Sequence, residues 1–222
     1  EIHWRDWSSD VCSSDLAPWN YPVSLAIMPI ATAIAAGNRV MVKPSEYTPE
    51  TSALLVQMLG TVFPPDQVAV ILGDAAVGAA FSGLAFDHLL FTGSTAVGRA
   101  VMRAASENLV PVTLELGGKS PTIVLEDADI EQAARGICYG IFSSGGQACI
   151  AGSRLFVHEK VYPQLMARLL ELTRGLRIGH PFSDDTHIGP LINEQHRDGV
   201  LAYVELAKRE GGRVLCGGEI PA

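Results

Sequence analysis

The chain has 222 residues, of which 48% are hydrophobic and 18% are charged, and its formal net charge is −8. This length and composition allow one or two globular domains and exclude a wholly disordered chain. The acidic balance argues against a nucleic-acid-binding groove or a polybasic membrane patch, and no apolar run has the roughly 18 residues of a membrane-spanning helix.

The first segment, residues 1–16, shows no apolar period, and the character of the sequence changes abruptly at Ala17. Its part Arg5–Leu16 (RDWSSDVCSSDL) resembles the translation of a common short-read sequencing adapter. We therefore interpret residues 1–16 as a foreign, disordered segment and leave them out of the predicted fold. An ordinary mobile N-terminus is the alternative.

From Ala17 onward, predicted strands and helices alternate along the chain. Short apolar runs bounded by turn residues predict strands, and longer segments with apolar residues at helical spacing predict helices. The predicted strands are 39–43, 68–72, 88–92, 112–116, 122–125, 154–158 and 213–216. The predicted helices are 22–36, 48–60, one from about residue 74, 95–106, 129–141, 161–172 and 194–210. This alternation predicts an α/β fold with a largely parallel sheet.

Two motifs follow predicted strands directly, which is where ligands bind in open α/β sheets. Lys43 and Glu46 could hold the hydroxyls of a ribose, with a solvated loop pair as the alternative. Gly93 and Ser94 precede a helix whose free N–H groups could bind a pyrophosphate, although both residues are also ordinary at a helix start. The GxGxxG dinucleotide fingerprint is absent.

Glu115 and Cys149 are the candidate catalytic groups. Glu115 ends an apolar strand, where desolvation would favour a general base, while a strand end in water is the alternative. Cys149 lies in the Gly-rich segment 143–152, which can present a thiol as a nucleophile. The alternative is a small buried hydrophobe, the role expected for Cys138 and Cys216. Because the cysteines form no CxxC pair and the histidines no metal-ligand pattern, we expect a reducing compartment and no metal site.

Taken together, these motifs resemble the aldehyde dehydrogenase superfamily over Ala17–Ala222. In chain order they read PWNYP at 18–22, KPSE at 43–46, FTGS at 91–94, LELGGKSP at 114–121 and GQAC at 146–149. Residues 86–121 look closest to coniferyl-aldehyde-type members, and the region from Cys149 onward looks like semialdehyde or betaine-aldehyde-type members. The resemblance implies a Rossmann-like, partial NAD(P)-binding domain over 17–116 and a partial α/β catalytic domain over 117–222.

The resemblance also implies a role for each matching residue in oxidising an aldehyde to a carboxylic acid with NAD(P)+. Cys149 would be the nucleophile, Asn20 an oxyanion donor, and Glu115 the base that activates water to hydrolyse a thioester. The implied cofactor-binding residues are Trp19, Lys43, Glu46, Gly73, Gly93, Ser94 and Leu116. Glu46 would repel a 2′-phosphate and so favours NAD, whereas Lys43 leaves NADP open.

The resemblance covers about half of a family member, so we expect an incomplete chain that is inactive by itself. For the complete enzyme it implies a cytoplasmic homodimer or homotetramer that acts on a small-molecule aldehyde, without a nucleic-acid or membrane partner. A CoA-acylating aldehyde dehydrogenase is the alternative activity. Glu115 argues against it, because transfer of the acyl group to CoA needs no water-activating base.

Overall fold

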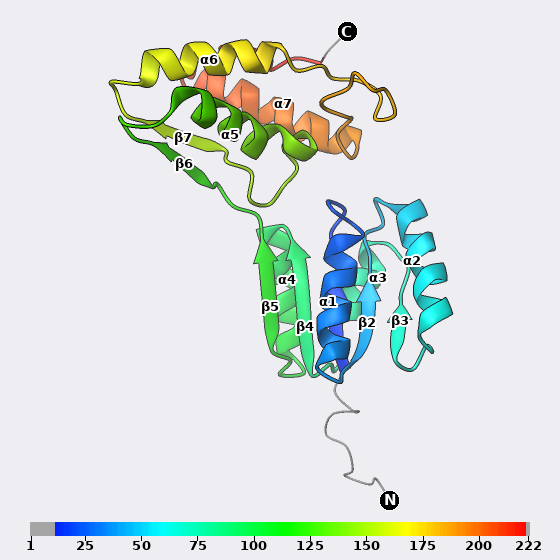
Figure 1. The fold of residues 1–222 in the computed structure, drawn as a ribbon. Helices are drawn as coiled ribbons and strands as arrows, with labels where there is room; N and C mark the ends of the chain where they lie inside the picture. Colours follow the sequence, from blue (N-terminus) through cyan, green and yellow to red (C-terminus); the bar gives the residue numbers. More distant parts are fainter. Residues whose placement is uncertain (1–11, 221–222) are drawn as a thin grey trace, which may run out of the picture. The chain divides into compact units, whose positions relative to one another are not determined.

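The computed structural model describes residues 12–220 and contains two compact units, one ending at Gly117 and the other beginning at Gly118 (Figure 1). The sequence placed the boundary between residues 116 and 117. Each unit has its own sheet and its own apolar core.

The first unit is built on a five-stranded sheet with the order β3-β2-β1-β4-β5. Its strands are β1 (Cys12–Leu16), β2 (Arg39–Lys43), β3 (Val68–Val70), β4 (His88–Gly93) and β5 (Val112–Leu116). Every neighbouring pair is parallel, which confirms the predicted fold class. The order reverses beside β1, because the chain proceeds outward to β2 and β3 and then returns to β4 on the other side. In open α/β sheets, ligands bind beyond the carboxyl ends of the strands at such a point.

Helices cover both faces of this sheet. On one face, α1 (Ser24–Ala35) and α2 (Pro49–Val62) contribute to a core cluster with β2. On the other face, α3 (Ala75–Ser82) and α4 (Thr95–Ser106) contribute to a cluster with β4. The first cluster includes Ala26, Ile30, Val40, Val42, Leu55 and Leu59, and the second includes Leu16, Phe81, Leu89, Phe91, Val101 and Ala105.

The central strand β1 corrects the prediction for residues 12–16. We expected this segment to lie outside the fold, but Cys12–Leu16 pairs with β2 on one side and β4 on the other. Residues 1–11 lie outside the described residues. The prediction failed because Leu16 is the only aliphatic residue of this strand, whereas central parallel strands are usually rich in Val, Ile and Leu; Ser14 and Asp15 occupy buried positions instead. Backbone hydrogen bonds to two neighbours do not require apolar side chains.

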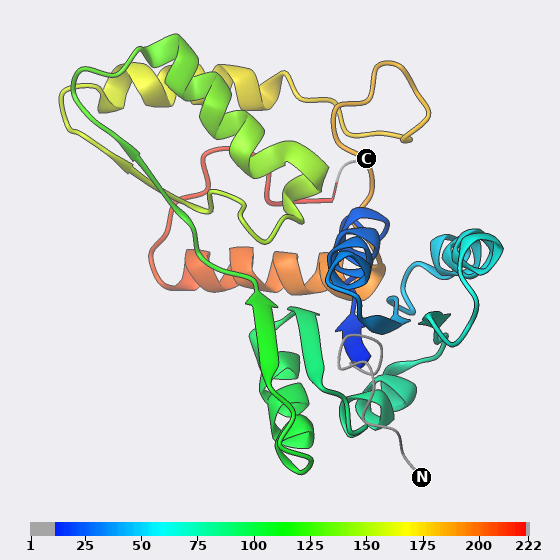
Figure 2. The same ribbon diagram turned by 60° about the horizontal axis from the view of Figure 1, so that its bottom comes forward.

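The second unit contains a parallel pair of strands, β6 (Pro121–Val124) and β7 (Arg154–Val157). Figures 1 and 2 show α5 (Ile130–Phe142) and α6 (Tyr162–Arg174) side by side over these strands. A 3₁₀ turn at Ser143–Gly146 follows α5, and α7 (Glu194–Arg209) is the last helix in the described part of the chain.

The contact between α5 and α6 combines apolar packing with ion pairs. Ala134 and Leu165 are fully buried in this core. Glu131 accepts hydrogen bonds from Arg168 Nε at 2.7 Å and Arg168 Nη2 at 2.9 Å, and also from Arg135. These bonds, with Arg168 contributing most, lower the pKa of Glu131 to about 2. Because these side chains are solvated, the pairs orient the helices more than they stabilise them.

The predicted strand at 213–216 is wrong. Within residues 12–220, this segment is irregular and adds no strand to either sheet. A strand needs a neighbour for its N–H and C=O groups, and a short apolar run such as Val214-Leu215 cannot reveal whether one is present.

Candidate functional site

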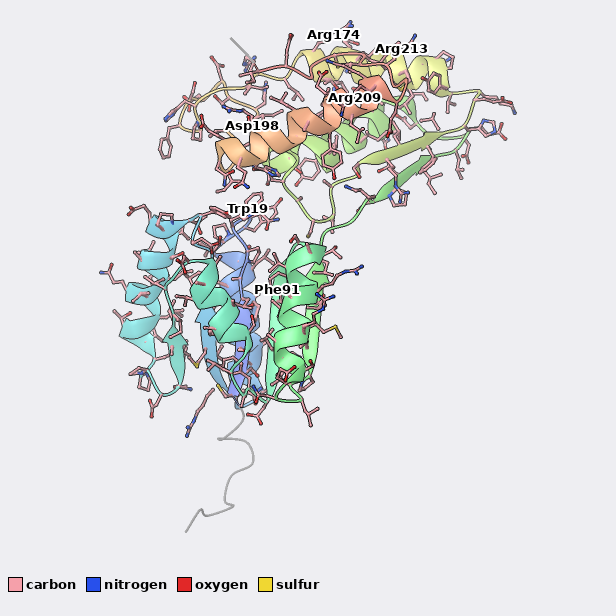
Figure 3. The ribbon with its side chains drawn as sticks, turned by 180° about the vertical axis from the view of Figure 1, so that it is seen from behind. Trp19, Phe91, Arg174, Asp198, Arg209 and Arg213 are labelled. Atoms are coloured by element: carbon pink, nitrogen blue, oxygen red, sulfur yellow. The ribbon has the colours of Figure 1, made fainter. Side chains whose placement is uncertain are left out.

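The cofactor-binding residues predicted from the resemblance gather at the carboxyl edge of the five-stranded sheet. Each one ends a strand or follows it within a few residues, and parallel strands all end at the same edge. Figure 3 labels Trp19 beyond the end of β1 and Phe91 within β4, on the two sides of the reversal in strand order. Along the edge, β1 leads to Trp19, β2 to Lys43 and Glu46, β3 to Gly73, β4 to Gly93 and Ser94, and β5 to Leu116.

Lys43 lies in the interior of this edge. This lysine is only 4% exposed, and its Nζ donates to Pro44 O at 3.1 Å and to Glu46 Oε2 at 3.2 Å. The carbon chain of Lys43 passes α3 at Gly78, where a Cβ would lie 3.5 Å from Lys43 Cε. A solvated loop pair does not describe this arrangement, because an ammonium group is rarely buried without a structural or functional partner. The pair retains one donor on Lys43 and free acceptor positions on Glu46 for hydroxyl groups of a ligand.

The turn between β4 and α4 forms the middle of the edge. Ser94 is the N-cap of α4, and its Oγ accepts a hydrogen bond from Val97 N at 3.3 Å. The remaining first-turn N–H groups of a helix point beyond its start, where they favour a negatively charged group, and the Ser94 hydroxyl can donate one further hydrogen bond there. A Cβ on Gly93 would lie 2.5 Å from Phe91 Cζ, so this turn can close against the buried ring only without a side chain.

The turn after β3 also requires a glycine. A Cβ on Gly73 would lie 2.5 Å from the Cβ of Val77 in the first turn of α3. Asp74 caps that helix by accepting from Ala76 N at 3.0 Å and Val77 N at 3.1 Å. Together with the Lys43–Glu46 pair and the start of α4, this cradle fits a dinucleotide: hydroxyl-binding groups beside β2, and a phosphate-binding helix start after β4.

We expect Gly93→Ala to disturb the turn that the sequence predicts to bind phosphate. The added methyl group must displace the ring of Phe91, which is only 7% exposed, or shift the start of α4. Overpacking of this kind costs about 1–3 kcal/mol of the free energy of unfolding and moves the N–H groups that would hold phosphate. Urea unfolding and NAD titration measure the two effects.

Gly60→Ala is the matched control for that substitution. Gly60 lies within α2, and a Cβ there would meet nothing within 4 Å. Alanine has the higher helix propensity, so this variant should gain roughly 0.5–1 kcal/mol. Equal behaviour of the two variants would show that the contact between Gly93 and Phe91 imposes no constraint.

Asn20 and Trp19 lie in the short connection between β1 and α1. Both residues are half-buried, and the next residue, Tyr21, has a φ of 50°, which is uncommon for a side chain with a Cβ. The peptide N–H of Ala17 donates to Lys43 O at 3.1 Å and joins this connection to the end of β2. The side chain predicted to stabilise an oxyanion is therefore carried by a constrained turn at the carboxyl edge.

Glu115 lies on β5, an edge strand of the sheet. Its neighbours Leu114 and Leu116 face the core cluster beside α4, so Glu115 faces the other way and is exposed. Of the two alternatives left open by the sequence, a carboxylate in water is the one observed. Within the described residues this carboxylate makes no ion pair, which leaves both oxygens available to a water molecule.

Cys149 belongs to the second unit, in a turn between α5 and β7. Its side chain is exposed, so the alternative of a small buried hydrophobe does not apply. Among the described residues, the Cys149 N–H donates to no protein group and is available to a ligand oxygen. The Gly-rich segment thus exposes the Cys149 thiol and also leaves the peptide N–H of this residue available.

The backbone around Cys149 is anchored on both sides. Before it, Ser144, Gly145 and Gly146 all have φ between 53° and 75°. Gln147 Nε2 donates to Ser144 O at 3.1 Å, while Gln147 Oε1 accepts from Ile192 N at 2.9 Å. After it, Gly152 N donates to Gly140 O at 3.1 Å. These bonds, rather than burial of the thiol, determine the path of the turn.

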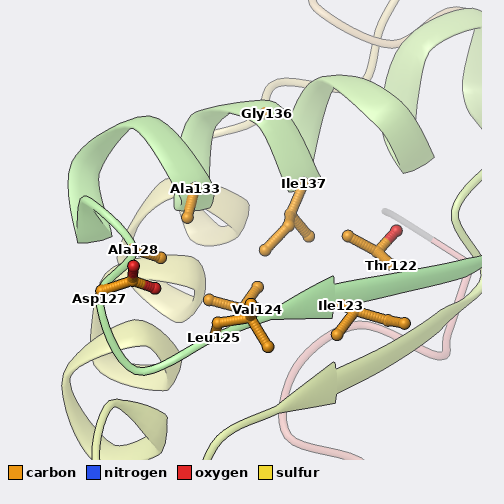
Figure 4. A pocket seen from close by; sticks show the side chains of 9 residues that line it. All are labelled: Thr122, Ile123, Val124, Leu125, Asp127, Ala128, Ala133, Gly136 and Ile137. Carbon is orange, nitrogen blue, oxygen red and sulfur yellow. The ribbon is translucent and has the colours of Figure 1, made fainter.

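A separate apolar pocket of about 390 Å³ opens between β6 and α5 (Figure 4). In the close-up, Ala133 and Ile137 point from the helix toward the strand. The lining residues are Thr122, Ile123, Val124, Leu125, Asp127, Ala128, Ala133, Gly136 and Ile137. None of the predicted site residues is among them, so the pocket contributes nothing to the candidate site.

Residues 12–220 contain no candidate membrane span and no candidate metal site. No helix there combines the length and apolar character needed to cross a membrane. No group of three or more His, Cys, Asp or Glu side chains in the same range is placed to hold a metal ion.

Sequence reasoning missed two contributors to the site. The strand β1 determines where Trp19 and Asn20 lie, but its polar residues do not form the apolar pattern from which strands were predicted. Phe91 supports the turn at Gly93, whereas the motif alone indicated only an apolar strand residue. A bulky aromatic two residues before a glycine at a strand end is a signal that could have revealed this contact.

Comparison with known proteins supports one family. The model of the aldehyde dehydrogenase family matches residues 12–222. A probable coniferyl aldehyde dehydrogenase of Pseudomonas aeruginosa is 46% identical over 201 residues, covering 90% of this chain and 42% of that protein. A crystal structure of PnpE from Pseudomonas sp. WBC-3 has a TM-score of 0.90 at 40% identity, and covers 95% of this chain and 44% of that one.

A betaine aldehyde dehydrogenase from Staphylococcus aureus, solved in complex with NAD+, has a TM-score of 0.91 at 35% identity, over 95% of this chain and 42% of that one. The chain thus spans about two fifths of the length of the relatives it matches. Both the sequence and the fold agree with these proteins over nearly all of the described residues. The chain therefore belongs to the aldehyde dehydrogenase family.

Proposed function

We propose that this chain is part of an enzyme that oxidises an aldehyde to a carboxylic acid with NAD+. The observation that carries the proposal is the carboxyl edge of the first sheet. There, the ion pair between the buried Lys43 and the exposed Glu46 lies on one side of the reversal in strand order, and the start of α4 lies on the other. The exposed Cys149 of the second unit supports it by supplying the nucleophile.

The edge residues would bind and orient the cofactor. Lys43 and Glu46 would donate to and accept from the ribose hydroxyls, and Ser94 with the first N–H groups of α4 would hold the pyrophosphate. Gly73, Trp19 and Leu116 would line the same site. The Glu46 carboxylate would repel a 2′-phosphate, which favours NAD over NADP. The S. aureus relative was solved with NAD+, in agreement with this preference. When bound, the nicotinamide supplies the hydride acceptor.

This chain's own residues would perform the covalent steps. The Cys149 thiolate attacks the aldehyde carbon, and the C=O electron pair moves to oxygen, where Asn20 and the Cys149 N–H donate to it. Loss of hydride from that carbon leaves a thioester on Cys149. Glu115 then takes a proton from water, whose oxygen attacks the thioester, and the C–S bond breaks to release the acid and the thiolate.

The substrate, location and assembly of the whole protein are part of the proposal. Its relatives are named for coniferyl aldehyde and betaine aldehyde, so we propose a small-molecule aldehyde as the substrate. We also propose a cytoplasmic enzyme that assembles as a homodimer or homotetramer, and that has no nucleic-acid or membrane partner.

A chimera tests the activity. Residues 17–220 of this chain would replace the matching segment of the P. aeruginosa relative, with which it shares 46% identity. The chimera, the relative and the 222-residue chain are then incubated with aldehydes and NAD+, with and without CoA. Formation of free acid and NADH by the chimera supports the proposal. Acyl-CoA as the product would favour the CoA-acylating alternative, and a folded chimera that binds NAD+ without turnover would contradict the proposal.

We expect Glu115→Gln in the chimera to separate the two chemical stages. The amide cannot accept the proton of water, so hydrolysis should slow by about 10²–10⁴-fold. A rapid first burst of NADH should persist, because attack by Cys149 does not require Glu115. Stopped-flow absorbance and mass spectrometry of acylated Cys149 measure the two stages.

Glu107→Gln is the matched control for the substitution at Glu115. Glu107 is an exposed carboxylate at the C-terminal end of α4, far along that helix from Ser94. Turnover should therefore stay at the level of the unsubstituted chimera. A lost burst in Glu115→Gln, or normal turnover, would show that Glu115 does not serve as the hydrolytic base.

A further inference from the structure

A glutamine side chain holds the turn that carries Cys149. Gln147 lies two residues before Cys149 and is half-buried. Its Nε2 donates to Ser144 O at 3.1 Å, and its Oε1 accepts from Ile192 N at 2.9 Å. One amide group thus joins the turn to a backbone segment that lies 45 residues further along the chain.

The backbone before Cys149 needs this support. Ser144 has a φ of 53° and a ψ of 30°, and Gly145 and Gly146 also have positive φ. The left-handed conformation is unfavourable for a residue with a Cβ, so neighbouring groups must hold Ser144 in it. Ser144 O accepts one hydrogen bond from Gln147 N at 3.2 Å and another from Gln147 Nε2. Both bonds come from the same residue, which therefore stabilises the strained part of the turn.

Residues 188–192 form the surface against which the turn rests. A Cβ on Gly145 would lie 3.8 Å from Leu191 Cδ2 and 3.9 Å from Ile188 Cγ2, so these two side chains face the turn. The last residue of the segment, Ile192, directly precedes the N-cap of α7. The hydrogen bond from Ile192 N to the glutamine side chain therefore ties the turn to the start of a helix of 16 residues.

The supported turn determines where the peptide N–H of Cys149 points. Cys149 and Ile150 are the central residues of a tight turn, which Ala151 N closes by donating to a carbonyl oxygen at 3.1 Å. That carbonyl belongs to Ala148, which directly follows Gln147. The N–H of Cys149 is part of the peptide group that links it to Ala148. A shift of the Gln147 backbone would therefore rotate this peptide group and redirect its N–H.

We propose that Gln147 is a positioning residue, which directs the Cys149 N–H at the substrate oxygen by holding the turn against residues 188–192. The inference rests on the proposed function, because this N–H stabilises an oxyanion only if Cys149 attacks a carbonyl carbon. Gln147 acts through the backbone and needs no contact with the substrate. An amide side chain suits the position, because the bond to Ser144 O needs a donor and the bond from Ile192 N needs an acceptor.

Gln147→Met in the chimera tests the positioning role. Methionine is of similar length and makes neither bond. We expect kcat to fall by about 10–10²-fold with KM little changed, because a displaced oxyanion donor weakens binding of the transition state and not of the aldehyde. Alkylation of Cys149 by iodoacetamide, followed by mass spectrometry, should keep its rate, because the thiol stays exposed and this displacement forms no oxyanion. Gln132→Met, at an exposed glutamine in the first turn of α5, is the matched control and should change neither rate.

Gln147→Glu gives a readout that a loss of packing alone would not give. In its protonated form the new side chain can donate to Ser144 O and accept from Ile192 N, as the amide does. Once ionised, it only accepts, and one of its oxygens faces a carbonyl oxygen, which raises its pKa above the usual value of about 4.3. Relative to the unsubstituted chimera at each pH between 5 and 9, its kcat should therefore be highest at the acidic end and fall as the pH rises.

The outcomes separate this inference from the proposed function. An unsubstituted chimera that forms no acid overturns the proposed function and the positioning role with it. An active chimera overturns the positioning role alone in three cases: kcat is unchanged in Gln147→Met, Cys149 alkylation falls as far as kcat, or the relative kcat of Gln147→Glu does not change with pH.

Discussion

Cys149→Ala should abolish aldehyde oxidation in the chimera that carries residues 17–220. Removing the nucleophile removes the covalent route, and a hydride cannot leave a free aldehyde that lacks an added nucleophile. By analogy with other enzymes whose nucleophile has been deleted, we expect kcat to fall by at least about 10⁴-fold. Binding of NAD+ should persist, because the residues proposed to bind the cofactor lie on the first unit. Absorbance of NADH and calorimetric titration with NAD+ measure the two quantities.

The matched control is Cys138→Ala. Cys138 is a half-buried residue within α5, where burial raises the pKa of its thiol above the usual value. It packs against the core cluster of the second unit and should affect stability but not the chemical step. Oxidation that survives in Cys149→Ala, or that is lost equally in both variants, would contradict the assignment of the nucleophile.

Asp15→Val should stabilise the first unit more than any other single substitution considered above. At pH 7 the unchanged chain must keep Asp15 protonated in the folded state, about three pH units above the pKa of a free aspartate. Keeping Asp15 protonated lowers the free energy of unfolding by up to about 4 kcal/mol at pH 7, and this loss is absent when valine replaces it. Valine also adds apolar contact at a position between Val42 and Leu90. Urea unfolding of the first unit, followed by amide exchange in β2 and β4, measures the gain.

The gain from Asp15→Val should depend on pH in one direction. The raised pKa of Asp15 makes its contribution to stability largest below about pH 4, and this contribution is lost as the pH rises to about 8. The difference between the variant and the unchanged chain should therefore grow from pH 4 to pH 8. Asp66→Val, at an exposed position, should show no such growth. A destabilised Asp15→Val would mean that the carboxyl is satisfied by a group outside the described residues.

The buried Asp15 also bears on the origin of the first residues. A foreign origin of Arg5–Leu16 remains a prediction, and the structure places part of this segment in the middle of a sheet. The central strand of a parallel sheet usually carries apolar side chains. Fully buried Ser14 and Asp15 are therefore expected if an unrelated sequence occupies that strand position. Strand pairing depends on the backbone, so such a segment can still occupy that position.

The candidate site was predictable from the sequence only in part. The motifs around Lys43, Gly93 and Cys149 were enough to predict a ligand-binding charge, a phosphate-binding turn and a nucleophile. A charged residue or a glycine after a strand, and a thiol in a Gly-rich segment, each allow few kinds of chemistry. The burial of Lys43 and the exposure of Glu115 were not predictable, since both follow from which neighbours a strand has in the sheet. The local sequence of a strand does not show whether it lies at the edge or near the centre of a sheet, because that depends on the neighbouring strands.

The sequence by itself determined the alternation of strands and helices from Ala17 on, the family, and the identity of the chemical groups. Local spacing and capping residues such as Ser94 are enough for this, because they act within a few residues. Only the tertiary structure decided that β1 occupies the centre of the sheet and that 213–216 forms no strand. Both depend on pairing between segments far apart in the chain, and the free energy of that pairing comes from partners that no local pattern reveals.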